Sequence, residues 1–301
     1  MTKRIFISST GRTGTQFFSK YLKRMIDNSV SLHEPGTPWL SKPDLLKKQL
    51  KDYGLYHMTI GQSKNTHSMY KLSRDYLAEE VSKKKAIDNI IQINRQVESL
   101  YESENIVYSS GHIYGLLGLL DEIYKDSRFI FIIRDPRTWI ESAMNKTEYS
   151  LYGPVELIFR NISLKPSCFY DDPYKHCWHK LSKFEKYCWY YSKLNEFVLS
   201  DMAEKENFKV FKYEDIFLSN LRTHHFKELL DFASDFESGP VKTSYFPSLL
   251  NKKVDSKSNG DAWQSWDVKK AKILHKHCGD LMKKFGYGHE ELWMDMVMAD
   301  D

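Results

Sequence analysis

The first 25 residues contain the pattern that most restricts the fold: an apolar strand, a glycine-containing turn and an amphipathic helix. Residues 4–7 (Arg-Ile-Phe-Ile) are typical of a buried parallel strand. A turn with Gly11 and Gly14 follows, and apolar side chains then recur at helical spacing over residues 17–25. In such a turn the backbone N–H groups point inward and the helix start adds positive potential. This segment is therefore expected to bind an anionic group.

The same alternation of strands and helices continues along the chain. It predicts an α/β fold with a central parallel sheet flanked by helices, in a single domain over residues 1–301. Residues 37–104 and 145–180 are expected to be helical or irregular insertions on the substrate side. Ligands of such sheets bind at the carboxyl ends of the strands. Further strands are expected at residues 30–32, 105–109, 129–133 and 208–211, and helices at 83–101, 116–124, 180–203 and 268–285.

Composition and charge restrict the kinds of binding partner and the location expected for this protein. The net charge is +4, and the one dense basic cluster, residues 83–85, is typical of a solvated helix face, so nucleic acid is not an expected partner. No signal peptide and no membrane-spanning run is apparent, which predicts a cytoplasmic protein. Its four cysteines are expected to be free thiols. Homo-oligomerisation stays open.

The turn differs from the loop that binds nucleoside triphosphates. That loop reads GxxxxGK[ST], and its Ser/Thr hydroxyl holds magnesium. Here Gly14 is followed by Thr15-Gln16, and the basic residue, Arg12, precedes the glycine. A kinase or NTPase is therefore disfavoured, although it stays an alternative beside a non-catalytic nucleotide-binding module.

The order Arg12-Thr13-Gly14-Thr15 resembles the 5′-phosphosulfate loop of sulfotransferases that use 3′-phosphoadenosine 5′-phosphosulfate (PAPS). The resemblance implies that Arg12 clamps the sulfonate oxygens as a catalytic residue. Gln16 departs from the family, which has Thr or Ser there. The loop residues implied to bind the donor are Gly11, Arg12, Thr13, Gly14, Thr15 and Gln16.

Later segments resemble the same family. Arg134 ends an apolar strand and Ser142 follows eight residues later, like the pair that holds the donor's 3′-phosphate. Lys257 and Ser258 open a segment, ending at Trp263, that resembles the family's late cofactor loop. Tyr213 matches a tyrosine near the adenine.

Together these segments identify the chain as a member of the sulfotransferases with a P-loop-like fold. The implied reaction is metal-independent transfer of a sulfonate group from PAPS to an acceptor hydroxyl, with release of 3′,5′-bisphosphoadenosine (PAP). The acceptor, a small molecule or a glycan, is not specified by any motif.

Two residues are candidates for the general base that accepts the acceptor's proton. Glu34, in His-Glu-Pro after the second strand, matches the catalytic glutamate of some relatives. His112 matches the histidine of others, although Ser110 replaces the lysine that precedes it there. Glu34 is favoured and His112 is expected to orient the acceptor, but the choice stays open.

The cysteines and histidines between residues 168 and 188 have no spacing typical of a zinc site, so no metal is expected there. The aromatic run 188–191 is predicted to lie in the core. Aromatic residues proposed to contact the acceptor are Tyr149, Tyr152, Phe169 and Tyr170.

Overall fold

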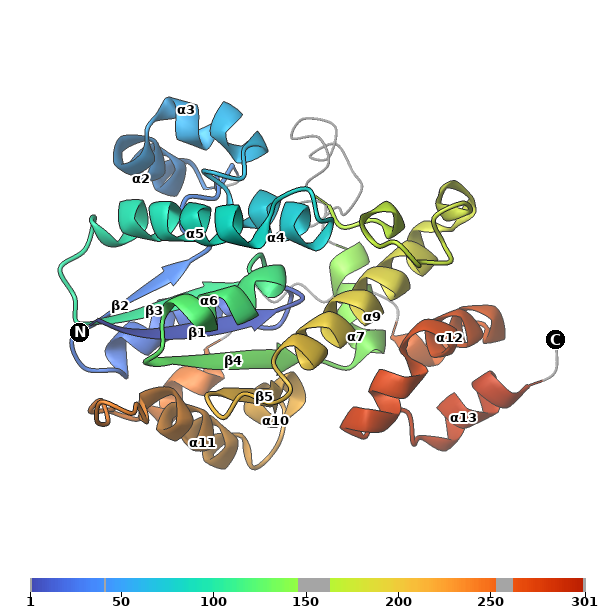
Figure 1. The fold of residues 1–301 in the computed structure, drawn as a ribbon. Helices are drawn as coiled ribbons and strands as arrows, with labels where there is room; N and C mark the ends of the chain where they lie inside the picture. The colour runs from blue at the N-terminus through green and yellow to red at the C-terminus, as the bar shows by residue number, and fades with distance from the viewer. Residues whose placement is uncertain (1, 41, 146–162, 253–261, 300–301) are drawn as a thin grey trace.

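Five strands form one parallel sheet. The computed structural model describes residues 2–40, 42–145, 163–252 and 262–299. The strand order is β2-β3-β1-β4-β5, and every neighbouring pair is parallel (Figure 1). The α/β class and the five predicted strands are confirmed. Their bounds are β1 Lys3–Ser9, β2 Ser29–His33, β3 Asn105–Ser110, β4 Ser127–Ile133 and β5 Phe208–Lys212.

Helices connect and cover these strands. Those predicted near residues 83–101, 116–124, 180–203 and 268–285 are confirmed, whereas α11 and α13 were not predicted. The first helix is shorter than expected, because α1 gives way to a 3-10 turn at Leu22–Arg24. The α-helix bounds are α1 Thr15–Tyr21, α2 Pro43–Tyr53, α3 Leu55–Met58, α4 Met69–Leu77, α5 Lys83–Glu98, α6 Leu117–Ile123, α7 Pro136–Met144, α9 Lys183–Asp201, α10 Tyr213–Phe217, α11 Arg222–Ser234, α12 Val268–Phe285 and α13 Glu291–Met298.

The alternation of side chains along each strand divides the core into two layers. Phe6 points to one face, where its ring stacks on those of Tyr108 and Phe129, each with centroids 5.1 Å apart. Helices α5, α6 and α9 cover this face (Figure 1). Ile5 and Ile7 point to the other face, which α1 and α11 cover. The sheet is therefore buried on both sides, as its continuous apolar strands predict.

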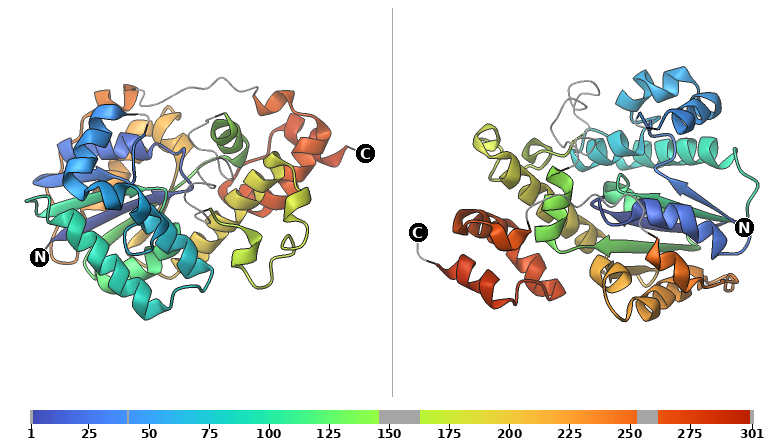
Figure 2. Two further views of the ribbon diagram at one scale, coloured as in Figure 1. Left: turned by 90° about the horizontal axis from the view of Figure 1, so that it is seen from above. Right: turned by 180° about the vertical axis from the view of Figure 1, so that it is seen from behind.

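The segments predicted as insertions differ in their packing. Helices α4 and α5 lie on the core, whereas α2 and α3 lie above α5, away from the sheet (Figure 1). A role of residues 37–104 toward a substrate stays a prediction. At the other end of the molecule, α12 and α13 lie opposite the start of β1 (Figure 2). In the described ranges, none of the helices has both the length and the apolar character needed to cross a bilayer.

The strand register brings several loops to one edge of the sheet. Ser8 of β1 pairs with Ser110 of β3, Ser9 pairs with Ile132 of β4, and His33 of β2 pairs with Ser109. The segments after β1, β2, β3 and β4 therefore begin side by side. This is the edge at which parallel sheets bind ligands.

Candidate active site

The loop after β1 has the backbone shape of an anion cradle. Gly11, Arg12 and Gly14 all have positive φ values, of 78°, 55° and 86°. Successive left-handed residues of this kind turn backbone N–H groups toward one concave side. A Cβ at Gly14 would lie 2.9 Å from ring carbons of Phe217, so any side chain there requires the ring to shift, in addition to the strain of the positive φ.

Two arginines and a serine meet beside this loop. The Nε of Arg12 donates to Ser142 Oγ at 3.2 Å, and Nη1 of Arg134 donates to the carbonyl of Arg12 at 2.8 Å. The indole N–H of Trp139 also supports the loop by donating to the carbonyl of Gly11 at 2.9 Å. The residues predicted from two distant motifs thus form one cationic surface.

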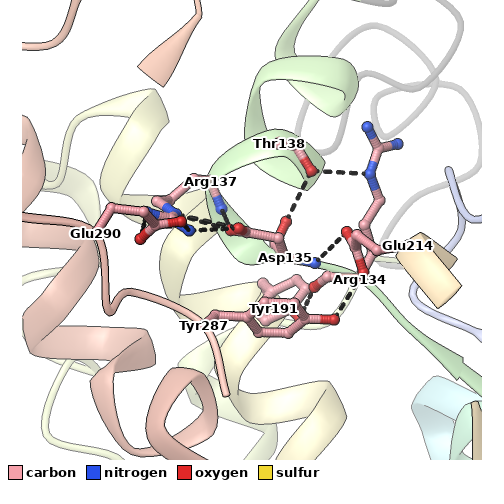
Figure 3. Close-up of polar contacts among 8 residues, drawn as sticks. All are labelled: Arg134, Asp135, Arg137, Thr138, Tyr191, Glu214, Tyr287 and Glu290. Carbon is pink, nitrogen blue, oxygen red and sulfur yellow. Dashed lines mark hydrogen bonds and ion pairs between the residues drawn. The ribbon is translucent and has the colours of Figure 1, made fainter. Parts of the chain in front are cut away.

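Arg134 is fixed in place by several contacts. Its Nε donates to Thr138 Oγ1 at 3.0 Å (Figure 3). Its guanidinium carbon lies 4.6 Å from the ring centroid of Tyr213. Its backbone carbonyl accepts a hydrogen bond from the hydroxyl of Tyr191. Among the described residues, its Nη2 has no hydrogen-bond partner. That nitrogen is therefore available to an external anion.

The turn that carries Arg134 is held by an ionic network (Figure 3). The buried guanidinium of Arg137 bonds the carboxylates of Asp135 and Glu290, with shortest distances of 2.7 Å to each. The backbone N–H of Asp135 donates to Glu214 at 3.0 Å, and the hydroxyl of Tyr287 donates to the same carboxylate at 2.8 Å. Helix α10 and the connection between α12 and α13 are thereby tied to the end of β4.

The two candidate bases lie together. His112 Nε2 is 3.8 Å from Glu34 Oε1, and their side chains are 20% and 17% exposed. The ring of Tyr70 stacks on that of His112, with centroids 4.3 Å apart. Gly111, next to His112 in the chain, lies against the loop, because a Cβ on it would be 3.1 Å from the nitrogen of Gly11.

Charge and burial set the protonation states of the pair. Burial alone would raise the pKa of Glu34, but His112, His33 and the Gly111 N–H outweigh it, so that this pKa is lowered. Burial lowers the pKa of His112, and the attraction of Glu34 offsets this only in part. At neutral pH, Glu34 is therefore a carboxylate and His112 a neutral imidazole. Both are in the form that a base requires.

A narrow cavity begins at this pair and continues between the sheet and α5. Its polar end is formed by Glu34, Ser110 and His112. The remaining lining is mostly apolar, and comprises Phe6, Pro35, Thr37, Met69, Ile93, Asn94, Val97, Tyr108, Ile113 and Leu120.

Comparison with known families agrees with this geometry. A sequence model of the sulfotransferase family matches residues 4–223. The chain belongs to the sulfotransferase family. Among curated individual proteins, none matches the chain. The family match includes the β1 loop, the Glu34–His112 pair and the Arg134 turn, and it ends before α12 and α13. The parallel sheet between helices is consistent with the sulfotransferase fold.

Other predicted donor residues of this sulfotransferase have varied surroundings. The hydroxyl of Thr13 is buried and has no hydrogen-bond partner within the described part of the chain. The side-chain oxygen of Gln16 accepts from Lys42 at 3.4 Å, and Tyr213 lies under the guanidinium of Arg134. Lys257 and Ser258 lie outside the described residues. Their roles stay predictions.

Several site residues were not predicted from the sequence. Lys42 adds a cation near the loop, Phe217 packs against Gly14, and Trp139 supports Gly11. Only Trp139 had a local signal, because it lies five residues after Arg134, on the helix that Asp135 caps. The others come from segments with no motif.

The remaining expectations concern residues 168–191. Trp189, Tyr190 and Tyr191 are buried, which confirms the predicted aromatic core. All four cysteines are unpaired, and in the described ranges no three His, Cys, Asp or Glu side chains are grouped as metal ligands. Among the proposed acceptor contacts, Phe169 packs near Trp189 and Tyr170 is 91% exposed, whereas Tyr149 and Tyr152 lie outside the described residues.

Proposed function

We propose that this sulfotransferase moves a sulfonate group from PAPS to an acceptor hydroxyl and releases PAP. The observation that carries the proposal is the convergence of Arg12, Arg134 and Ser142 on the left-handed loop after β1. PAPS has two anionic groups, the 5′-phosphosulfate and the 3′-phosphate. Two guanidinium groups beside an anion cradle match that pair of charges.

The donor would lie with its phosphosulfate on the loop and its 3′-phosphate near Arg134 and Ser142. The buried hydroxyl of Thr13, which lacks a protein partner, suits a phosphate oxygen. Thr15-Gln16 replaces the Lys-Ser/Thr that would hold magnesium in a triphosphate loop. Fixed N–H donors and Arg12 would instead stabilise the charge that develops on the leaving phosphate, so the proposed reaction needs no metal.

On the acceptor side, Glu34 is proposed as the general base. The acceptor oxygen forms a bond to sulfur while the bond from sulfur to the bridging phosphate oxygen breaks. The acceptor's proton passes to the Glu34 carboxylate, and the electron pair of the broken bond leaves with PAP. His112, which is neutral, would orient the hydroxyl. The close approach of Gly111 to Gly11 supports the position of His112 and its partner Glu34 beside the donor loop.

Calorimetry of nucleotide binding tests the donor. With EDTA present, PAP should bind more tightly than AMP or ATP. Both AMP and ATP lack the 3′-phosphate that Arg134 and Ser142 are proposed to bind. Equal affinities for PAP and AMP would contradict the assignment. A screen of acceptor pools with sulfonate-labelled PAPS then tests transfer itself, and label should appear in a hydroxyl-bearing product without added metal.

A further inference from the structure

The turn that carries Arg134 is held from outside the matched family region. The family match ends at residue 223, yet Tyr287 and Glu290 both reach this turn. They lie on the short connection between α12 and α13, where Gly286 and Gly288 have positive φ values of 69° and 78°. The connection thus brings an ionised and a phenolic side chain to the end of β4 (Figure 3).

Arg137 is the centre of this arrangement. Its side chain is 2% exposed, whereas that of Glu290 is 49% exposed. Its guanidinium carbon lies 4.2 Å from the ring centroid of Trp263 and 5.1 Å from that of Trp293. The bond from Arg137 lowers the pKa of Glu290, so this carboxylate is ionised at neutral pH. A buried arginine in this position needs both carboxylates, because loss of one partner leaves buried charge poorly compensated.

The network reaches Arg134 through its neighbour. Asp135 pairs with Arg137 through its side chain, and its backbone carbonyl accepts from Thr138 Oγ1, which in turn accepts from Arg134 Nε. The N–H of Asp135 is held by Glu214. Asp135 therefore cannot move without changing the direction of the Arg134 side chain.

We propose that Arg137 and Glu290 are positioning residues for Arg134, so that the segment between α12 and α13 contributes to recognition of the donor's 3′-phosphate. The inference rests on the proposed function, which assigns Arg134 to that phosphate. A positioning role for the Arg137–Glu290 ion pair can be distinguished from a structural one. Loss of a structural pair would lower stability alone, whereas loss of a positioning pair would also lower the preference for PAP over AMP.

The test compares Glu290→Gln with Glu291→Gln in the full chain. Glu291 is the adjacent glutamate, exposed and on the same helix turn, and thus a matched control for loss of one charge. Calorimetry gives the ratio of PAP to AMP affinity. Glu290→Gln should reduce this ratio by about three- to tenfold, as expected when a coupled contact is weakened. Glu291→Gln should leave it unchanged.

A second variant approaches the turn by the other route. Tyr287→Phe removes the hydroxyl that supports Glu214 but keeps the ring, and it should lower the same ratio. A fall in melting temperature with an unchanged ratio in both variants would overturn the proposal, because the network would then be structural only.

Hydrogen exchange keeps this outcome separate from failure of the proposed function. If the wild-type protein shows no preference for PAP, the donor assignment fails, and the positioning link is judged by exchange alone. The amides of Asp135 and of residues 137–139 should then exchange faster in Glu290→Gln than in Glu291→Gln. Equal exchange in the two variants would overturn the link.

Discussion

Replacement of Arg134 by alanine is the most direct perturbation of the proposed donor site. In the structure, Arg134 uses Nε and Nη1 for contacts within the protein and leaves Nη2 for a ligand. A hydrogen bond to a charged group contributes about 1.5–3 kcal/mol. At about 1.4 kcal/mol for each factor of ten, Arg134→Ala should weaken PAP binding by about 10- to 150-fold.

The assay is calorimetric titration of the variant with PAP and with AMP. AMP serves as the internal control, because it has no 3′-phosphate for Arg134 to bind. Arg134→Lys keeps the charge but loses the forked guanidinium, and should be intermediate for PAP. Equal losses for PAP and AMP would refute the reasoning, since Arg134 would then act only through its bond to the Arg12 carbonyl. Normal PAP binding would mean that the arginine is structural.

Three further predictions concern the base and the loop. Glu34→Gln should reduce kcat by about 10²- to 10⁴-fold with little change in PAPS affinity; a larger loss in His112→Asn, measured in the same turnover assay, would reverse the two roles. Because the pKa values of Glu34 and His112 are both lowered, their base forms persist on acidification. The kcat value should therefore stay level from pH 8 down to about 6.5. A kcat that has already fallen to half its maximum above that pH would contradict this prediction. Gly14→Ala should lower the melting temperature more than Gly286→Ala, because both glycines are left-handed, with φ and ψ of 86° and 17° and of 69° and 39°, but only a Cβ at Gly14 meets Phe217; equal decreases would show that the Phe217 contact does not matter.

Short sequence patterns were sufficient to predict most strands of the sheet and the residues of the proposed donor side. The apolar runs at residues 4–7 and 129–133 fixed two inner strands, because a uniformly apolar strand needs cover on both faces. The glycine pattern and the position of Arg134 at a strand end indicated the proposed donor side. Each of these features depends on residues that are close in sequence.

Other parts of the site depend on tertiary structure. Glu34 and His112 were separate candidates in the sequence, and their 3.8 Å contact follows from the pairing of β2 with β3. The bonds of Arg137 to Glu290 span 153 residues, and no local pattern encodes such a distance.

Two residues of the candidate site combine an unusual backbone conformation with a side chain that the proposed chemistry requires. Arg12 and Glu34 have φ values of 55° and 43°. In this region the Cβ of any residue other than glycine crowds the backbone. Each such residue costs the folded state about 1–3 kcal/mol. Glycine at either position would relieve that strain, but it would also remove the cation or the carboxylate on which the proposed chemistry depends. With the roles proposed for Arg12 and Glu34, optimisation for thermal stability and optimisation for turnover favour different residues at the ends of β1 and β2.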